Sequence, residues 1–395
     1  MSQPDMSGYM EKLLDGVEVE WRPLKEVLVR TKGTKITAGQ MKELHKDGAP
    51  VKIFAGGRTV AFVNYDDIPT KDINREPSVI VKSRGVIEFE YYDKPFSHKN
   101  EMWAYHSNRP EISIKYLYHF LKLNEPYFQS IGGKMQMPQI ATPDTDKFSV
   151  PIPCPDNPEK SLEIQAEIVH ILDAFTAMTA ELTAELTAEL NLRKQQYNYY
   201  RDQLLSFEEG EVEWKKLGDV LQMRAGQHIS ASKIAPSSSD DYSYPCFGGN
   251  GVRGFVKDKS HDGKHLLIGR QGALCGNVQR MKGQFYATEH AVVVTTSDEI
   301  DIDWAFHMLT HMNLNQYASQ SAQPGLAVGK LQGLKIPVPS IDEQKHVASI
   351  LDKFDALTNS ITEGLPREIE LRQKQYEYYR DLLLSFPKSN GEAVA

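Results

Sequence analysis

The chain contains two copies of one helical sequence, and this duplication constrains its fold more than any other feature. Residues 189–207 read ELNLRKQQYNYYRDQLLSF and residues 368–386 read EIELRQKQYEYYRDLLLSF, with 13 identities in 19 positions at a constant offset of 179. A second pair of segments, 164–173 (IQAEIVHILD) and 343–352 (EQKHVASILD), lies at the same offset. Because the stretches between these repeats do not resemble one another, we expect one structural frame that carries two different inserts.

Apolar residues recur at helical spacing in both copies. From Ile164 they follow one another in steps of three and four as far as Met178, and three successive steps of four come next. Those steps arise because the sequence TAEL occurs three times between Thr179 and Leu190. The spacing predicts two long helices, each with one apolar seam. The predicted seam of the two helices includes Leu182, Leu186, Leu190, Ile361, Leu365 and Ile369.

A long helix with a single apolar stripe needs a partner that covers the stripe. Each copy offers the same seam, so we expect the two helices to pair with each other as a coiled coil. The alternative is that each helix packs separately on its own domain, and the matching spacing of the two seams favours pairing. Pro366 lacks an N–H group and would clash with the preceding turn, so we expect a kink or break near residues 364–366.

The first residues of the chain resemble the end of the same repeated helix. Residues 9–14 (YMEKLL) align with residues 200–205 (YRDQLL), and the segments that follow align Trp21 with Trp214. We therefore expect the N-terminal segment to lie beside residues 379–386. Such contact would close the chain into a ring with approximate two-fold symmetry.

Length and composition are those of a chain with several domains and no membrane span. With 395 residues, the chain can form two or three domains, each with its own core. It has no run of about 18 apolar residues and no signal-like N-terminus, so we expect a cytoplasmic protein. The cysteines, Cys154, Cys246 and Cys275, are odd in number and form no CxxC pair, which argues against a disulfide framework or a zinc knuckle.

Charge is distributed unevenly along the chain. The net charge at pH 7 is -8, yet the unlike stretches, residues 28–149 and 221–335, carry +4 and +2, and the remainder carries -14. Positive charge on the unlike stretches and negative charge on the repeats is the distribution expected of a DNA-binding protein built on an acidic frame. Ordinary domains also reach a charge of +4, so charge alone does not decide the function.

The unlike stretches contain short β-branched and aromatic runs broken by Gly and Pro, and these runs predict strand-rich domains with some helix. In the second stretch, a Gly-rich turn at 247–255 (FGGNGVRGF) is followed by LIGRQGALCG at 267–276. A weaker echo in the first stretch runs FAGGRTVAF at 54–62 and then IVKSRG at 80–85. This order predicts two diverged versions of one fold.

Polar side chains beside these glycines are the candidate DNA-binding residues. Arginine and glutamine suit bidentate contacts with guanine and adenine, and glycine allows the backbone to approach a ligand closely. The alternative is that the glycines only shape strand turns and that the arginines are solvated. The candidates are Arg253, Arg270 and Gln271 in the second stretch and Arg58, Arg84, Lys134 and Gln136 in the first.

No catalytic motif is present in the sequence. It has no GxxxxGK[ST] phosphate loop, no strand–glycine–helix dinucleotide fingerprint and no element typical of amino-methyltransferases. Residues 262–264 and 343–345 have the Asp/Glu-x-Lys spacing of some nucleases, but no second acidic residue accompanies either of them. The histidines of the second stretch have no cysteine or carboxylate spacing that completes a metal site.

The repeats resemble the DNA-specificity subunit of type I restriction–modification systems, and the TAEL array resembles its IC-like subclass. The similarity covers nearly the whole chain. It implies an α+β protein in which two strand-rich mixed globular target-recognition domains are separated by two long antiparallel conserved helices that form a coiled-coil spacer, in a pseudo-two-fold circular organisation. The implied parts are an N-terminal conserved segment (1–27), target-recognition domain 1 (28–150), a central conserved region with the long helix and TAEL repeats (151–210), target-recognition domain 2 (211–335) and a C-terminal conserved region with a long helix (336–395).

The resemblance implies a non-catalytic subunit that binds a bipartite asymmetric site on double-stranded DNA, with one half-site for each recognition domain. Its expected partners are two methyltransferase subunits and two restriction subunits, which act as motor and nuclease. Those partners would bind S-adenosylmethionine, ATP and Mg²⁺, so no cofactor is expected in this chain. In the family, the number of TAEL repeats sets the length of the DNA spacer between the half-sites. The alternatives are a self-contained restriction enzyme and a protein-only coiled-coil scaffold.

Overall fold

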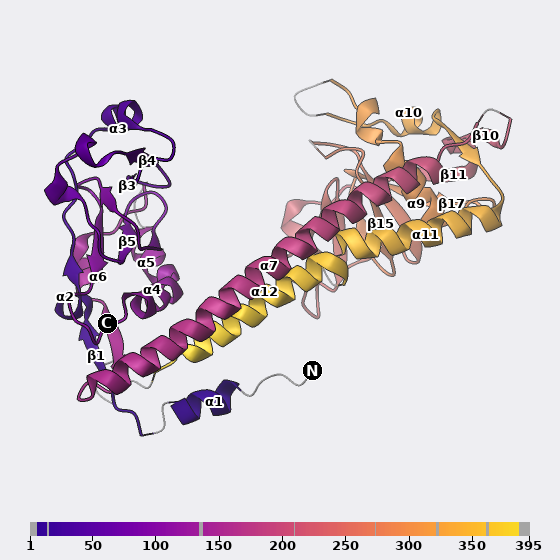
Figure 1. Cartoon of the computed structure of the whole chain (residues 1–395). Helices are drawn as coiled ribbons and strands as arrows, with labels where there is room; N and C mark the ends of the chain where they lie inside the picture. The colour runs from indigo at the N-terminus through magenta and orange to yellow at the C-terminus, as the bar shows by residue number, and fades with distance from the viewer. Residues whose placement is uncertain are drawn as a thin grey trace. The chain divides into compact units, whose positions relative to one another are not determined.

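The structure is a computed structural model, and contacts along the chain divide it into two compact units (Figure 1). The first unit is Met1–Ala184 with Glu370–Ala395, and the second is Glu185–Ile369. Each unit therefore holds one of the unlike stretches together with parts of the repeated helices. The described residues are 6–13, 16–133, 137–208, 210–272, 274–320, 324–360 and 363–386.

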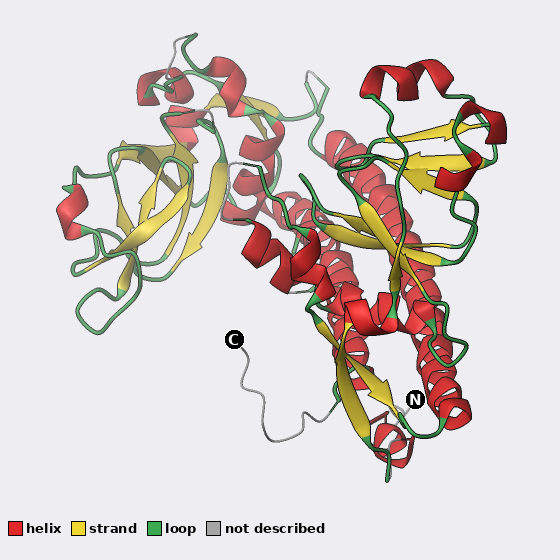
Figure 2. Ribbon diagram, turned by 90° about the vertical axis from the view of Figure 1, so that its left-hand side faces the viewer, coloured by secondary structure: helices red, strands yellow, loops and turns green. Residues whose placement is uncertain are grey.

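The described part of the first unit contains a four-stranded sheet, a three-stranded sheet and a separate pair of strands (Figure 2). Neighbouring strands are antiparallel except β3 and β7, which are parallel. In sheet order, the larger sheet is β2 (Val29–Arg30), β8 (Trp103–His106), β5 (Ser78–Lys82) and β6 (Glu88–Tyr92). The smaller sheet is β4 (Val60–Val63), β3 (Val51–Phe54) and β7 (Phe96–His98), and the separate pair is β1 (Val19–Pro23) with β9 (Ser149–Pro153).

Short helices pack around these strands, and the core forms between the larger sheet, α4 and the start of the long helix. Tyr105, Tyr116 and Phe128 are fully buried there, together with Ile168 of the repeated sequence. The unlike stretch of this unit therefore shares its core with the repeat. The helices are α1 (Met6–Leu13), α2 (Leu24–Val27), α3 (Ala38–Leu44), α4 (Ile114–Leu123), α5 (Glu125–Gly132) and α6 (Thr142–Asp146), with short 3-10 turns η1 (Tyr65–Asp67) and η2 (Thr70–Asp72).

Within its described residues, the second unit repeats the strand order of the first. Its larger sheet is β11 (Leu221–Ala225), β17 (Ala291–Thr296), β14 (Lys264–Gly269) and β15 (Val278–Lys282). Its smaller sheet is β13 (Gly251–Val256), β12 (Tyr244–Gly248) and β16 (Tyr286–Ala287), and β10 (Glu213–Lys216) pairs with β18 (Lys335–Val338). Its helices are α8 (Leu217–Val220), α9 (Ile302–His311) and α10 (Val328–Gln332), with 3-10 turns η3 (Ala231–Lys233) and η4 (Leu314–Tyr317).

The two strand-rich stretches therefore share one topology. In both larger sheets, the strand that comes first in the chain pairs with the last, the last pairs with the second, and the second pairs with the third. The smaller sheet has one parallel pair, β3 with β7 or β12 with β16. The prediction of two diverged versions of one fold is confirmed by this topology. The strands are accompanied by some helix, as predicted, and α9 (Ile302–His311) is an example.

The repeated sequences form the long helices. The first is α7 (Pro158–Leu204), which is continuous over 47 residues, and the second copy is divided into α11 (Ile341–Asn359) and α12 (Gly364–Leu383). Gly364 has φ of +77°, and a Cβ atom there would lie 2.5 Å from the carbonyl oxygen of Ala356. Pro366 falls in the first turn of α12, where no intrahelical N–H donor is required. The predicted break near residues 364–366 is confirmed.

Aromatic contacts join α7 to the second copy within each unit. In the first unit, Phe175 of α7 stacks on Tyr379 of α12 with ring centroids 5.5 Å apart. In the second unit, Tyr200 of α7 stacks on Phe354 of α11 at 5.7 Å. Of the predicted seam, Leu182, Leu186, Leu190, Leu365 and Ile369 are half-buried, and Ile361 lies outside the described residues.

The N-terminal segment packs on the first unit, where the hydroxyl of Tyr9 donates to Glu167 Oε1 of α7 at 2.7 Å. Leu13 and Val17 join the hydrophobic cluster that contains Leu383 and Phe386. That this segment lies directly beside residues 379–386 stays a prediction.

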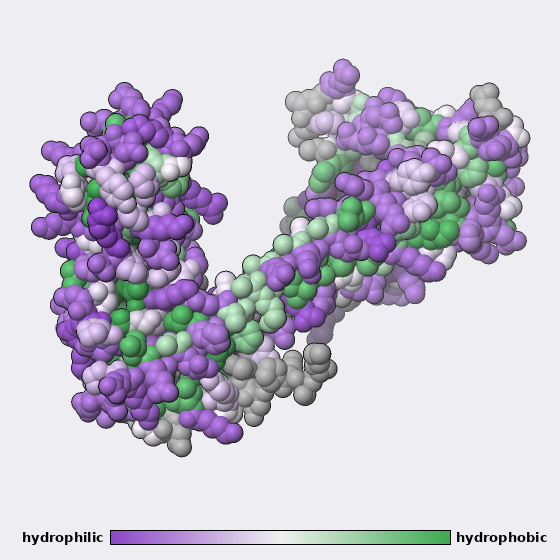
Figure 3. Space-filling model, in the orientation of Figure 1, coloured by the Kyte–Doolittle hydropathy of each residue, from purple (hydrophilic) through white to green (hydrophobic). Residues whose placement is uncertain are grey.

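The surface of each unit is mainly polar. On the face shown in Figure 3, hydrophilic residues cover most of the strand-rich part of each unit, and hydrophobic residues line the visible side of the long helices. Among the described residues, no helix has the length and hydropathy needed to cross a membrane. Nor does the described part of the chain contain a cluster of His, Cys, Asp or Glu side chains that could hold a metal ion.

Candidate nucleic-acid interface

Turns from both sheets meet at one edge of each unit. One turn joins the two long strands of the smaller sheet, the second follows β5 or β14, and the third precedes β8 or β17. We call these residues the turn rim. It comprises residues 55–59, 83–85 and 99–101 in the first unit and residues 249–250, 270–272 and 288–290 in the second.

Backbone hydrogen bonds build the two turn rims in the same way. In each unit the second turn is bonded on both sides to a segment that leads into the last short helix, and the two sets of bonds match atom for atom. Side chains take no part in these bonds, so the bonds themselves place no restriction on which side chains the rims present. The matched bonds are Gly85 N to Pro138 O (2.9 Å) with Gly272 N to Pro324 O (3.0 Å), and Ile140 N to Ser83 O (3.0 Å) with Leu326 N to Arg270 O (2.8 Å).

This match places Arg84 and Gln271 at equivalent positions. Arg84 forms an isolated bridge with Gln139, and Gln271 forms one with Gly325. Both side chains are exposed at the centre of their rims. The predicted residues Lys134 and Gln136 lie outside the described residues.

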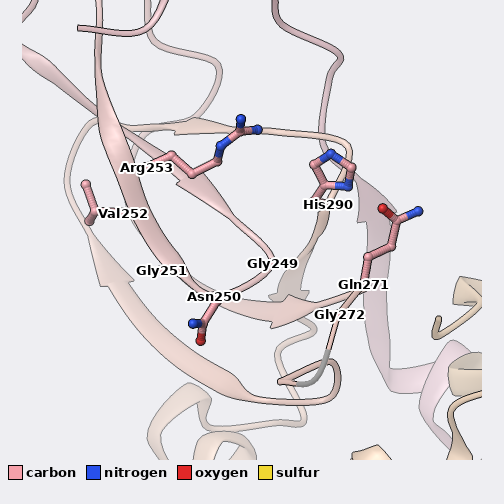
Figure 4. Close-up of a pocket in the computed structure, with 8 residues that line it drawn as sticks. All are labelled: Gly249, Asn250, Gly251, Val252, Arg253, Gln271, Gly272 and His290. Atoms are coloured by element: carbon pink, nitrogen blue, oxygen red, sulfur yellow. The ribbon is translucent and has the colours of Figure 1, made fainter. Parts of the chain in front are cut away.

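The rim of the second unit encloses a hollow of about 370 Å³ (Figure 4). Arg253 and Gln271, which the sequence singled out, both line it, and so do Asn250 and His290, which were not among the predicted DNA-binding residues. Polar groups from the hairpin and from two other turns therefore converge on one open space. The remaining lining residues are Gly249, Gly251, Val252 and Gly272.

Glycine allows the turns of this rim to pack backbone against backbone. A Cβ atom on Gly269 would lie 2.0 Å from the carbonyl oxygen of Gly249, and one on Gly249 would lie 3.0 Å from the carbonyl oxygen of Gln271. A side chain on Gly269 would push the first and second turns apart and would displace Gln271 from the hollow. The Gly-rich sequence is therefore a requirement of the rim's packing.

Arg270 supports the rim and does not line the hollow. Its Nη1 donates to the carbonyl oxygen of Glu289 at 3.2 Å, and the backbone N–H of Arg270 donates to the carbonyl oxygen of His290 at 2.8 Å. Contact of Arg270 with DNA therefore stays a prediction. Arg270 joins the second turn to the third because the two turns exchange these bonds.

Buried polar atoms lie beneath the hollow. Within the described part of the chain, Arg270 Nε, Glu289 Oε2 and His290 Nδ1 are buried and have no hydrogen-bond partner. Burial raises the pKa of Glu289, but the hydrogen bond from His228 (2.9 Å) and the adjacent His290 outweigh it, so the pKa is lowered overall. Buried polar groups are normally bonded, so these three atoms are among the exceptions in the described part of the chain.

The rim of the first unit carries different chemistry on the same backbone. Arg58 and Arg84 are both exposed, and their turns are joined by a hydrogen bond of 3.1 Å from Gly57 N to the carbonyl oxygen of Arg84. Lys99 and Glu101 form an ion pair at 2.7 Å in the third turn and line a separate pocket of about 590 Å³ beside α3. The structure therefore brings together the two arginines that the sequence predicted.

Glu101 is ionised within this cationic rim. Partial burial opposes ionisation, but the hydrogen bond from Lys99 and the nearby Arg84 guanidinium lower the pKa of the carboxyl group. Glu101 and His290 occupy equivalent positions, two residues before the strand residues Trp103 and Val292 that pair with β5 and β14. Sequence comparison did not find either residue because the third turns, KNE and TEH, have no identical residue at any aligned position.

Comparisons with known proteins place the whole chain in one family. Residues 17–192 and 209–371 match the family described as the type I restriction modification DNA specificity domain. Over 378 residues the chain is 53% identical to the type I restriction enzyme EcoprrI specificity subunit of Escherichia coli, a match that covers 90% of this chain and 92% of that protein. It is also 38% identical over 414 residues to the EcoR124I/EcoR124II specificity subunit of Escherichia coli, covering 96% and 98% of the two chains.

A solved structure shares the fold. The crystal structure of the type I restriction–modification S subunit from M. genitalium superposes with a TM-score of 0.56 at 15% identity and covers 95% of this chain and 98% of that one. A duplicated strand-rich domain joined by long helices is thus common to both. The chain belongs to the family of DNA specificity subunits of type I restriction–modification systems.

Proposed function

We propose that this chain recognises a bipartite asymmetric DNA site, with one half-site bound at each turn rim. The observation that carries the proposal is that two rims share one set of backbone hydrogen bonds and present different side chains. A fixed backbone with variable donors and acceptors is suited to recognition of two different base sequences by the same docking geometry. The unlike stretches also hold the positive charge of the chain, which favours contact with phosphates.

The side chains of each rim indicate what kind of base edge it would contact. In the first unit, Arg58 and Arg84 suit the two acceptors of guanine, and the ionised Glu101 suits the amino group of cytosine. In the second unit, Gln271 suits adenine and Arg253 suits guanine, and His290 adds a donor or acceptor within the same hollow. The two half-sites would therefore differ in sequence.

The long helices would set the distance between the half-sites, as the similarity of the TAEL array to the IC-like subclass suggests. Four helical residues advance about 6 Å and leave a net rotation of about 40°. One base pair rises about 3.4 Å and turns about 34–36°. One TAEL repeat therefore nearly matches the twist of one base pair, and a domain rotated by any other angle would face the wrong part of the groove.

The repeats would also carry the partner subunits. Two pairs of side chains at the 179-residue offset are exposed, Leu192 (59%) with Leu371 (43%) and Tyr199 (63%) with Tyr378 (63%). Apolar side chains exposed at matching positions offer the same surface twice, which suits two copies of one methyltransferase subunit. Two restriction subunits would complete the assembly, and these partners would bind S-adenosylmethionine, ATP and Mg²⁺, leaving this chain without a catalytic role.

A methylation map tests the proposal. The chain would be expressed with a methyltransferase subunit of the same class and without the nuclease, and all methylated sites in the host DNA would be determined. One bipartite motif with a fixed spacer is the expected result. Methylation or cleavage by the purified chain alone would favour a self-contained enzyme, and an assembled complex without any motif would favour a protein-only scaffold.

A further inference from the structure

A glutamine at the same position of each repeat makes matching contacts with its recognition domain. Gln165 in α7 and Gln344 in α11 lie at the 179-residue offset, and both side chains are fully buried. Glutamine is seldom fully buried, and its amide then needs partners for both its oxygen and its nitrogen. The partners are therefore informative about its role.

In the first unit, the amide of Gln165 holds the residues that begin α4. Its Oε1 accepts from the backbone N–H of Ser113, the N-cap residue of α4, at 2.8 Å. Its Nε2 donates to the carbonyl oxygen of Glu111 at 3.0 Å. A single side chain of the repeat thus binds two backbone groups of the recognition domain.

In the second unit, the same bonds recur on α9. The Oε1 atom of Gln344 accepts from the backbone N–H of Asp301, the N-cap residue of α9, at 2.8 Å. Its Nε2 donates to the carbonyl oxygen of Glu299 at 2.9 Å. In both units the amide therefore binds the N-cap residue and the residue two positions before it, although the sequences 111–113 (EIS) and 299–301 (EID) belong to unlike stretches.

A second contact joins the same two helices in each unit. His119 of α4 bonds to Asp173 of α7 at 3.1 Å, and His307 of α9 bonds to Asp352 of α11 at 2.8 Å. Each histidine follows its N-cap residue by six positions, and each aspartate follows its glutamine by eight. Lys115 in the first unit and Arg280 in the second add a cation to the aspartate.

Two separate contacts restrict rotation of the domain relative to the repeat helix more strongly than a single contact does. The two contacts are eight residues apart on α7 or α11, which is about 12 Å along the helix. They are six residues apart on α4 or α9, which is about 9 Å. Rotation of the domain about either contact would break the other. Breaking the glutamine contact would also leave buried amide and peptide groups without partners.

We propose that the pairs Gln165 with Asp173 and Gln344 with Asp352 are positioning residues that fix each recognition domain on its repeat helix and so restrict the protein to one spacer length. This inference rests on the proposed bipartite recognition. Neighbouring spacers differ by about 34–36° of DNA twist. The two contacts, added to the core that each domain shares with its repeat helix, oppose that rotation, and losing one of them lowers the resistance to it.

The test compares spacer tolerance in Gln344→Met and Gln165→Met with that of the wild-type chain, each in complex with the methyltransferase subunit. Methionine has a similar length and no hydrogen-bonding amide. Lys345→Ala and Glu163→Ala are matched controls because both residues are exposed on the same helices. The substrates are DNA duplexes with the native spacer and with spacers one base pair shorter and longer.

We expect the wild-type and control complexes to methylate only the native spacer. In each Met variant, the rate on the neighbouring spacers relative to the native spacer should rise by about tenfold, the equivalent of about 1.4 kcal/mol. Asp173→Ala and Asp352→Ala should shift the ratio in the same direction. A residue that only stabilises the fold would lower methylation on every spacer without changing the ratio, so an unchanged ratio in the assembled variants would overturn the proposal.

Amide exchange separates this inference from the proposed function. In the Gln variants, backbone exchange at Ser113 and Asp301 should become at least about tenfold faster, whatever DNA the complex recognises. If the wild-type complex shows no bipartite motif, the proposed function fails, and the exchange result alone then decides whether the domains are held at two points. Unchanged amide exchange at both N-cap residues would refute the proposed two-point attachment.

Discussion

In each turn rim, backbone hydrogen bonds hold the residue at the centre, and its side chain takes no part in them. Arg84 and Gln271 occupy equivalent positions at the centre of their rims, each bonded through its backbone to the segment that precedes the last short helix. Because the frame is held by backbone groups, replacing either side chain should alter recognition and leave folding intact. The two rims should also respond independently, because each lies within its own unit.

Truncating one of these residues should reduce sequence specificity in only one half-site of the DNA. We expect Gln271→Ala to lose about 1–3 kcal/mol of discrimination at one position of the second half-site, because a bidentate base contact is removed. Arg84→Ala should do the same in the first half-site. Methylation maps of the two variants measure this, with the exposed Gln222 of β11 changed to Ala as the control. Relaxation of both half-sites by a single substitution would contradict separate recognition.

Two buried histidines, His119 of α4 and His307 of α9, should make the stability of the fold sensitive to acid. Burial lowers the pKa of His119 and of His307 below the ordinary value of 6.5, and the bond to Asp173 or Asp352 only partly offsets this effect. The unfolded chain then binds these protons more readily than the folded protein, so stability falls as the pH falls below 6.5. Nearby cations, Lys115 and Arg280, also lower the pKa.

Thermal unfolding measured between about pH 7.5 and pH 5.5 checks this dependence. The wild-type chain should lose Tm across this range, and the double variant His119→Gln, His307→Gln should lose less, because glutamine can bond to the aspartate without taking up a proton. The difference between the two proteins isolates these residues from the other histidines. A double variant with the same loss of Tm as the wild type would refute the assignment.

Residue types alone did not identify the whole site. The glycines marked two of the three turns because backbone packing requires them, as at Gly269, and this requirement leaves a trace in the sequence. The third turn has no such requirement, so Glu101 and His290 could be found only once the strands that follow them were aligned in space. The sequence also gave no sign that the guanidinium of Arg270 bonds to the carbonyl oxygen of Glu289.

At the scale of elements, periodicity predicted the long helices and their interruption. The apolar spacing matches α7, and the pair Gly364 and Pro366 marks the break between α11 and α12. What periodicity did not show is that α7 has two kinds of partner. Ile168 lies in the core of the recognition domain, whereas Phe175, seven residues later, stacks on α12. An apolar stripe predicts that one face of a helix is buried, but it does not predict which element covers that face.

The break at Gly364 should be intolerant of a side chain. Gly364→Ala would place a Cβ atom 2.5 Å from the carbonyl oxygen of Ala356 at a φ of +77°, and we expect it to destabilise the protein by about 1–3 kcal/mol. Gly329→Ala is the control, because Gly329 lies in α10 with no neighbour within 4 Å, and alanine there should be neutral or stabilising by up to about 1 kcal/mol. Chemical denaturation measures both. Equal stability of the two variants would show that the break adapts freely.

Removing one TAEL repeat should shorten the recognised spacer by about one base pair. Deleting residues 179–182 keeps the helical seam in register and removes about 6 Å and about 40° of net rotation. The recognition domains are untouched, so both half-site sequences should remain the same. The methylation map of the deletion variant provides the measurement. Deleting four residues and finding the original spacer would show that α7 does not set it.

The repeated helices occur twice in the molecule, so we expect two equivalent binding sites for a partner subunit. The same exposed pair of side chains occurs once in the second unit, as Leu192 and Tyr199, and once in the first, as Leu371 and Tyr378. A surface present twice predicts two partner molecules bound independently. An unlike pair of sites would instead predict that one partner binds before the other.

Partner stoichiometry therefore provides a test at this scale. Native mass spectrometry of the wild-type chain with the methyltransferase subunit should show two partners per chain. The variant Leu192→Ala, Tyr199→Ala should bind one partner, and so should Leu371→Ala, Tyr378→Ala, because each loses one apolar surface and keeps the other. The variant with all four changes should bind none, and Glu185→Ala, an exposed change on α7, should still bind two. If either double variant lost both partners, the two surfaces would form a single site, and the twofold use of the frame would not extend to assembly.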